Sequence, residues 1–148
     1  MVVADGHAPV AFATDPTGGM AGLVRHENLE SLPEGSGACV YQLWSLTTDP
    51  SPSNDDPTLA LESYSHDIPA GSTKWIMTQL APGFFTPMHA TSTIDYGIVV
   101  SGDIELGLEE GSTQLHAGDV MLINGVQHSW RAGPNGCVLA TVLVGACR

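Results

Sequence analysis

The sequence predicts an all-β protein of the barrel or jelly-roll kind, and three observations support this fold class. Short apolar runs recur along the chain, separated by Gly, Pro, Asn and Asp at the spacing typical of a sandwich or barrel. The 17 glycines and 10 prolines among 148 residues supply many tight turns. No heptad or long 3.6-residue pattern competes with the short runs.

The expected elements follow one another along the chain. Residues 1–36 are rich in Gly and Pro, and we expect an N-terminal arm there, in which LVRHENLE could form a short helical turn. The barrel is expected over residues 37–148. Its first strand is ACVYQLWSL, followed over residues 47–57 by the turn-forming run TTDPSPSNDDP, which is either a surface loop or a lid. Further strands are expected in TLALESYSH, TKWIMTQLA, DYGIVVSG, DIELGLEEG, STQLHAGD, VMLINGVQHSW and CVLATVLVG.

Composition limits the partners of this chain. Hydrophobic residues make up 43% and charged residues 14%, which indicates one packed globular domain. The formal net charge of −12 repels phosphate backbones and anionic lipid, so we expect neither nucleic acid nor membrane as a partner.

The three cysteines show no CxxC spacing, and two of them lie in apolar runs where a thiol behaves as a small hydrophobe. The first residues, MVVADGHAPV, lose their apolar character at Asp5 and His7, which is atypical of a signal peptide. A reduced, cytoplasmic protein is therefore the expectation.

The segment MHATSTIDYG, residues 88–97, combines one histidine, one carboxylate and several hydroxyls ahead of an apolar run. Side chains alternate between the two faces of a strand, and barrel mouths hold ligands. If His89 faces inward, the same alternation brings Asp95 inward, and His128 on a later strand could meet both. The predicted lining of the pocket is Trp75, Met77, Gln79, Thr91, Thr93 and Trp130.

Two motifs in the chain resemble those of the cupin superfamily. The usual first motif is Gly, five residues, His-x-His, three or four residues, Glu, six residues, Gly. Here Gly83, His89, Thr91, Asp95 and Gly102 keep that spacing, with Thr91 in place of a histidine and Asp95 in place of the glutamate.

The second motif is matched less closely by GDVMLINGVQHSW, where Asn124 replaces a proline and His128 stands one residue early. The pair resembles a group of small single-domain cupins with a His-x-Thr-x-Thr-Ile-Asp-Tyr-Gly first motif. The resemblance covers about residues 75–145 and implies a cupin-type jelly-roll β-barrel that forms a homodimer.

The resemblance also implies a metal site with His89, Asp95 and His128 as ligands, and Asp95 and His128 as catalytic groups. Two imidazoles and a carboxylate accept one divalent ion such as Fe, Zn, Mn or Ni. Asp95 is one methylene shorter than glutamate, and Thr91 is a poor ligand, so a site without metal stays open.

Three functions remain open at this point. The first is a metal-dependent enzyme of the dioxygenase, lyase or isomerase/cyclase type, acting on a small organic molecule with carbonyl or hydroxyl groups. The second is a metal-free acid–base isomerase or dehydratase that uses Asp95 or His128. The third is a cupin that binds a small ligand without chemistry.

Overall fold

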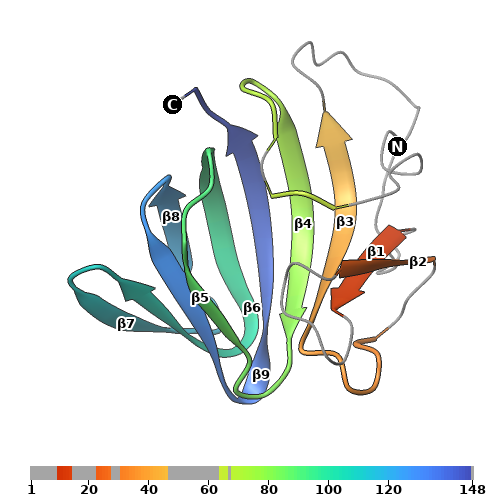
Figure 1. Cartoon of the computed structure of the whole chain (residues 1–148). Coiled ribbons are helices and arrows are strands. Elements are labelled where there is room, and N and C mark those ends of the chain that lie inside the picture. Colours follow the sequence, from red (N-terminus) through yellow and green to blue (C-terminus); the bar gives the residue numbers. More distant parts are fainter. Residues whose placement is uncertain (1–9, 15–22, 28–30, 47–63, 67, 148) are drawn as a thin grey trace.

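The computed structural model describes residues 10–14, 23–27, 31–46, 64–66 and 68–147, and every regular element among them is a β-strand (Figure 1). This confirms the predicted all-β class. The strands are β1 (Val10–Thr14), β2 (Leu23–Glu27), β3 (Ala38–Leu46), β4 (Thr73–Leu80), β5 (Phe85–His89), β6 (Thr93–Leu108), β7 (Gly111–His116), β8 (Val120–Asn124) and β9 (His128–Gly145).

Two long strands, β6 and β9, run through both halves of a jelly roll. The first half of β6 lies between β8 and the second half of β9, which pairs with β4 on its other side. The second half of β6 lies between β7 and the first half of β9, which pairs with β5. The chain therefore builds two sheets that share β6 and β9, with all described pairings antiparallel.

Glycines mark the corner where these strands pass from one sheet to the other. The register of β6 against β9 shifts between Val99 and Ser101 and again between Gly102 and Ile104. Gly102 has a φ of 74° and Gly136 on the facing strand has a φ of 77°, a region that side chains with a Cβ rarely adopt. The positive φ at this corner thus explains why the first motif ends in a glycine, Gly102.

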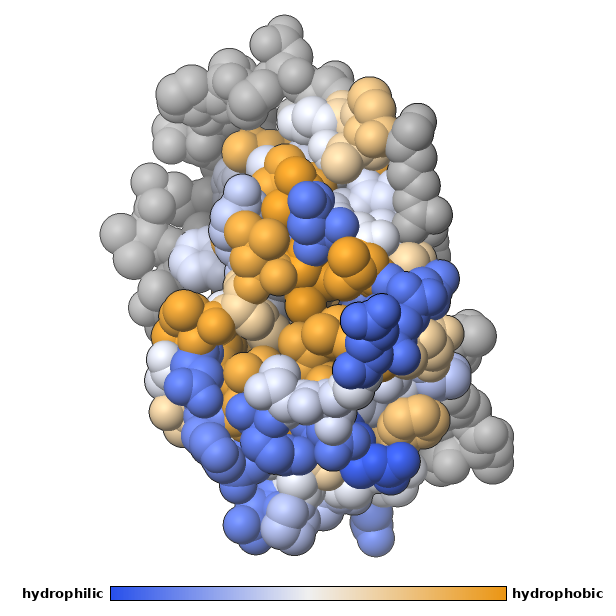
Figure 2. Space-filling view, turned by 90° about the vertical axis from the view of Figure 1, so that its left-hand side faces the viewer, coloured by the Kyte–Doolittle hydropathy of each residue, from blue (hydrophilic) through white to orange (hydrophobic). Residues whose placement is uncertain are grey.

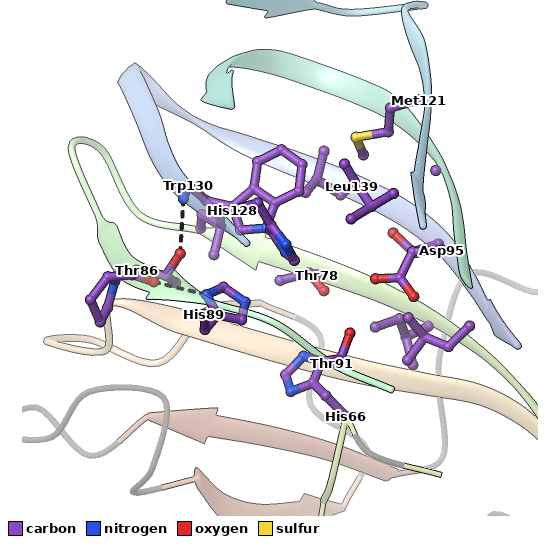
Figure 3. Close-up of a pocket in the computed structure, with 17 residues that line it drawn as sticks. His66, Thr78, Thr86, His89, Thr91, Asp95, Met121, His128, Trp130 and Leu139 are labelled. Carbon is purple, nitrogen blue, oxygen red and sulfur yellow. Dashed lines mark hydrogen bonds between the residues drawn. The ribbon is translucent and has the colours of Figure 1, made fainter. Parts of the chain in front are cut away.

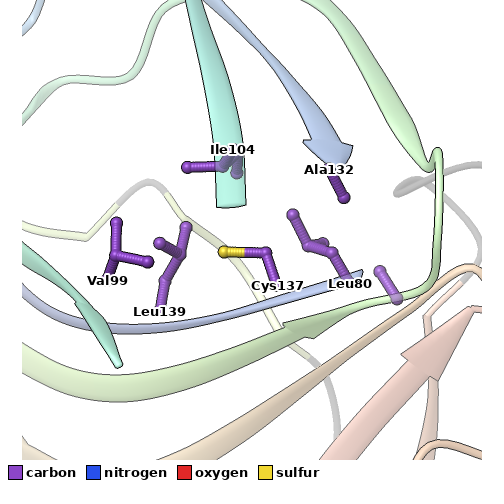
Figure 4. Packing of buried hydrophobic residues seen from close by; sticks show 7 residues of the cluster. Leu80, Val99, Ile104, Ala132, Cys137 and Leu139 are labelled. Atoms are coloured by element: carbon purple, nitrogen blue, oxygen red, sulfur yellow. The ribbon is translucent and has the colours of Figure 1, made fainter. Parts of the chain in front are cut away.

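The main core fills the space between the two sheets beside this corner (Figure 4). Its buried members come from β3, β4, β6 and β9, so residues far apart in sequence form a single cluster. They are Ala38, Leu80, Val99, Ile104, Ala132, Cys137 and Leu139. A second cluster of Val40, Ile76 and Leu143, covered by Tyr64 and Ile68, lies further along the same strands.

The residues predicted as an N-terminal arm contribute two strands to the sheet. β1 pairs with β3, and β2 pairs with β1, so the edge of β3 is covered. The expected helical turn in LVRHENLE is wrong, because Leu23–Glu27 forms strand β2. The possible lid over residues 47–57 lies outside the described residues.

The three cysteines are free: Cys39 and Cys137 are buried, and Cys147 is exposed. Burial raises the pKa of both buried thiols to about 11, so these side chains behave as neutral core groups. Within the described ranges, no helix is long and apolar enough to cross a membrane.

Candidate functional site

A cavity of about 370 Å³ lies between the two sheets, next to the main core (Figure 3). Its walls are mainly apolar, with a few imidazole, hydroxyl and carboxyl groups. The lining residues are His66, Ile76, Thr78, Leu80, Thr86, Pro87, His89, Thr91, Asp95, Gly97, Met121, Ile123, His128, Trp130, Leu139, Thr141 and Leu143. A volume of this size matches a small organic ligand.

Two histidines from different strands meet in this pocket. His89 ends β5 and His128 begins β9, and the two are paired directly in the ladder between these strands. Their ring centroids lie 4.4 Å apart, and the rings of His128 and Trp130 meet edge-to-face with their centroids 5.5 Å apart. The chain thereby brings together two imidazoles that are 39 residues apart in the sequence.

Backbone contacts fix the tautomer of each of these rings. Nδ1 of His89 donates to the Pro87 carbonyl oxygen at 2.8 Å, and Nδ1 of His128 donates to the Val126 carbonyl oxygen at 2.9 Å. Because a carbonyl oxygen only accepts, the neutral rings keep their lone pairs on Nε2. Burial lowers the pKa of His128, which further favours its neutral form.

Asp95 lies near the start of β6, across the pocket from the two imidazoles (Figure 3). Burial raises its pKa, although a hydrogen bond from Thr93 and the neighbouring His89 act in the opposite direction. Its Oδ1 is buried and has no hydrogen-bond partner among the residues that the structure describes. Behind it, the hydroxyls of Thr91 and Thr93 lie 2.6 Å apart. The carboxyl thus keeps one oxygen open for a bound molecule or ion.

The donor chemistry fits a divalent metal, because two Nε2 lone pairs and an unpartnered carboxylate oxygen are suitable ligands. The positions of the three side chains fit a single metal ion less well than their chemistry does. Among the residues that the structure describes, no three His, Cys, Asp or Glu side chains come together closely enough to hold one ion. The part that fits is therefore the imidazole pair, and Asp95 stands apart from it.

Four of the predicted pocket residues are placed elsewhere. The neighbouring residues Ile76, Thr78 and Leu80 face the cavity, so Trp75, Met77 and Gln79 point to the other side of β4. Trp75 lines a shallow hollow on the outer surface, and Gln79 accepts a hydrogen bond from the Tyr41 hydroxyl at 3.1 Å. Thr93 is buried behind Thr91 and does not line the cavity. Thr91 and Trp130 do line it.

His66 is a pocket residue that spacing along the sequence did not single out. Its ring packs edge-on against Tyr64 at 4.6 Å. Lys74, on the inward face of β4, holds this segment: its Nζ donates to the Ser65 carbonyl oxygen at 2.7 Å and lies 4.7 Å from the centre of the Tyr64 ring. In the sequence, this segment could have been found from Lys74, because a lysine at an inward position of a strand needs a polar partner nearby.

No family model matches the chain. The chain is 42% identical over 65 residues to Phomopsin biosynthesis cluster protein D of Diaporthe leptostromiformis. The matched segment covers 43% of this chain and 34% of that protein. It is 40% identical over 55 residues to the cupin-domain-containing oxidoreductase srdD of Neurospora crassa, covering 36% of this chain and 28% of that protein. The matched segments thus span about a third of the relatives' lengths or less.

Among solved structures, an RmlC-like cupin from Shewanella frigidimarina matches with a TM-score of 0.49 and 14% identity, covering 74% of this chain and 78% of that one. A likeness this distant supports no inference about function. Over the short matched segments, the chain is similar to cupin-domain-containing proteins, and all of its described regular elements are strands.

Proposed function

We propose that this chain is an enzyme that transforms a small, mainly apolar organic molecule in the pocket, with His89 and His128 at the reacting end. The observation that carries the proposal is the imidazole pair itself: two rings 4.4 Å apart, each with Nδ1 committed to a backbone carbonyl, in a cavity of about 370 Å³. Preorganised side chains of this kind are typical of catalytic or metal-binding sites.

The walls of the pocket support a proposal for the substrate class. Within the part of the chain that the structure describes, neither lysine nor arginine lines the cavity, so a highly charged anion has no guanidinium or ammonium partner there. Hydroxyls of Thr78 and Thr91 and the carboxyl of Asp95 lie among aliphatic side chains. We therefore assign a neutral molecule with one or two carbonyl or hydroxyl groups.

The finer proposal is that His89 and His128 hold one divalent ion, with substrate and water completing its shell. Such an ion supplies Lewis acidity and, if it is iron, access to oxygen chemistry. The names of two relatives, both cupin-domain-containing oxidoreductases, support a redox reaction. The residues of the chain itself exclude water with apolar walls, and they orient the substrate through Asp95 and Thr91.

A second candidate is acid–base catalysis without metal. The shifted pKa values of two pocket residues favour it. Burial raises the pKa of Asp95 and lowers that of His128, so the proton affinities of the two groups approach each other. Groups tuned in this way can hand a proton to and from a bound carbonyl or hydroxyl. Isomerisation or dehydration would suit such a pair.

Elemental analysis of the purified chain tests the metal proposal. His89→Ala and His128→Ala are compared with His116→Ala, a matched control because His116 is an exposed histidine paired with Asp103 at 2.7 Å. The expected result is close to one metal ion per chain, lost in the first two variants and kept in the control. A protein that stays empty after incubation with Fe(II), Mn(II), Ni(II) and Zn(II) contradicts it.

Turnover of a panel of small ketones, phenols and alcohols, followed by mass spectrometry and oxygen uptake, then separates the reactions. Activity that survives chelation and is lost in Asp95→Asn supports the acid–base candidate. If the panel compounds bind and are returned unchanged with and without added metal, the enzyme proposal is wrong and a ligand-binding role stands.

A further inference from the structure

The cavity has a second polar end, across from the imidazole pair. His89 and His128 come from β5 and the start of β9, which pair in one sheet. Asp95 comes from the part of β6 that pairs with β8 and with the end of β9, in the facing sheet. His66 reaches the cavity from the segment ahead of β4, and Figure 3 shows its ring beside Thr91. We call Asp95 and His66 the second polar end.

The rest of the cavity wall is mainly apolar. Ile76, Leu139 and Leu143 line it from β4 and β9. Hydrophobic side chains also gather on the side of the molecule that carries β8, the strand from which Met121 and Ile123 line the cavity (Figure 2). A ligand that fills this cavity therefore needs an apolar body, with polar groups where it meets the two polar ends.

The carboxyl of Asp95 selects the kind of group that fits the second polar end. Its Oδ1 is buried and has no hydrogen-bond partner within the described part of the chain, which costs free energy that a bound partner recovers. A ligand hydroxyl suits this oxygen in either protonation state, because it donates to a carboxylate and accepts from a carboxylic acid. A carbonyl only accepts, so it suits the acid alone. The chemistry therefore favours a hydroxyl at this end.

A buried lysine holds the segment that carries His66. Lys74 is 6% exposed, and its Nζ donates to the carbonyl oxygen of the exposed Ser65. The same Nζ lies over the ring of Tyr64, which packs edge-on against His66. Burial, and then the carboxylate of Asp95, raise the pKa of Tyr64, so this segment and Asp95 act on the same end of the cavity. An ammonium group is costly to bury, and here its contacts all serve the position of this segment.

We propose that Asp95 and His66 bind a hydroxyl group of the substrate at the second polar end, and that Lys74 is a positioning residue for His66. The inference rests on the proposed function in treating the bound molecule as a substrate. It narrows the substrate class to molecules with two polar groups on an apolar body. One group meets His89 and His128, and the other is a hydroxyl held across the cavity.

Isothermal titration calorimetry with acetophenone and its meta- and para-hydroxy derivatives tests this proposal. The three probes share a carbonyl and an apolar ring, and the two phenols add a hydroxyl at different distances from the carbonyl. We expect at least one phenol to bind the wild-type chain about tenfold more tightly than acetophenone, as one hydrogen bond to a buried group implies. The proposal is overturned if neither phenol binds more tightly than acetophenone, or if no probe binds.

Three variants assign this hydroxyl advantage to residues. His66→Phe keeps a ring against Tyr64 and removes the ring nitrogens, and Asp95→Leu removes both carboxyl oxygens at similar size. Each should abolish the advantage and leave the affinity for acetophenone within about threefold. His116→Phe, at an exposed histidine outside the cavity, should keep the advantage. An advantage that persists in His66→Phe and Asp95→Leu, shown to be folded by near-ultraviolet circular dichroism, overturns the proposal.

Lys74→Met separates positioning from a general structural role. The substitution keeps an unbranched side chain and removes the ammonium. If Lys74 positions His66, the hydroxyl advantage falls while the affinity for acetophenone stays, and Lys74→Arg, which keeps the charge and the donors, restores part of the advantage. A uniform loss of affinity for all three probes, or an advantage that is unchanged in Lys74→Met, overturns the positioning role.

Product analysis of the same probes distinguishes this inference from the proposed function. A hydroxyl advantage that depends on His66 and Asp95, with the probes returned unchanged, supports the binding inference and counts against the enzyme. Turnover of the probes with no dependence on His66 supports the enzyme and overturns the inference.

Discussion

His89 and His128 are direct partners in the β5–β9 ladder, with ring centroids 4.4 Å apart. The pairing depends on an irregularity, because the register shifts between the Thr86–Trp130 pair and the His89–His128 pair. A regular ladder from Thr86 would place a different residue opposite His128. The local distortion of β5 therefore brings the two imidazoles together, as bulges near functional sites often do.

The first prediction concerns Thr86, whose hydroxyl supports this distortion. Thr86 is buried, and its Oγ1 accepts a hydrogen bond from the Trp130 backbone N–H at 3.0 Å. Thr86→Val keeps the shape of the side chain and leaves that N–H unpaired, so the free energy of unfolding should fall by about 1–2 kcal/mol. Urea denaturation measures the change. Thr86→Ser keeps the acceptor, so its free energy of unfolding should fall by less. An equal fall in both variants would show that the methyl group matters and the hydroxyl does not.

The second prediction is a pair of opposite histidine titrations in the metal-free protein. Burial lowers the pKa of His128, whereas the hydrogen bond with Asp103 raises the pKa of the exposed His116. An NMR titration should place His128 below 6.5 and His116 above it. Asp103→Asn should return His116 towards 6.5 and leave His128 unchanged. The assignment is wrong if both histidines titrate on the same side of 6.5.

His128 also makes stability depend on pH. Its folded pKa lies below the unfolded value near 6.5, so the unfolded chain binds the proton more readily. The contribution of His128 to stability is therefore complete above pH 6.5 and declines as the pH falls below that value. His128→Gln should flatten this part of the stability profile, measured by urea denaturation between pH 5 and 7.5. A profile that keeps the same slope without His128 would assign the dependence to another group.

The third prediction is a gain in stability at Gln42. This side chain is fully buried on β3, and within the described part of the chain neither its Oε1 nor its Nε2 has a hydrogen-bond partner. Gln42→Leu removes the cost of burying an unpaired amide and should raise the free energy of unfolding by about 1–2 kcal/mol. Gln79→Leu is the matched control, since Gln79 accepts a hydrogen bond from Tyr41 and should gain nothing. A loss of stability in Gln42→Leu would mean that the amide is satisfied in solution.

The fourth prediction tests the orientation of β4. Thr78 lines the cavity and its neighbour Met77 faces the other way. Thr78→Phe should therefore weaken binding of a small apolar fluorescent dye by about tenfold, because the ring takes up part of the volume available to the ligand. Met77→Phe adds similar bulk outside the cavity and should leave the dye affinity unchanged. The opposite pattern would restore the orientation expected from the sequence.

Sequence patterns were sufficient to predict the strands that are bounded by clear turn-forming residues. ACVYQLWSL and TKWIMTQLA coincide with β3 and nearly with β4, and the runs from residue 95 to 111 join into the single long strand β6. β1, β2 and β5 were not predicted. Each has five residues, and their character depends on the neighbours with which they pair rather than on a strong pattern of their own.

The side-chain orientation on β4 could not be read from alternation, because each of its faces carries both apolar and polar residues. Ile76, Thr78 and Leu80 face the pocket side, and the opposite face carries Trp75 and Met77 together with the polar Gln79. The predicted ligands His89, Asp95 and His128 all line one cavity. Whether the three approach a single point depends on distances across the pocket, which motif spacing does not contain.

The long strands β6 and β9 have a consequence for how this protein can change. Along them, consecutive residues point to different surfaces. Leu143 lines the cavity and Val142 lies on the opposite, outward side of the sheet, and Gly97 and Tyr96 repeat this arrangement. Point substitutions can therefore alter the cavity and the outward face of the sheet independently. Loss or gain of a single residue within either strand would exchange the two surfaces at once. Lineages of this protein should accordingly diversify by replacement within β6 and β9 and confine length variation to the turns.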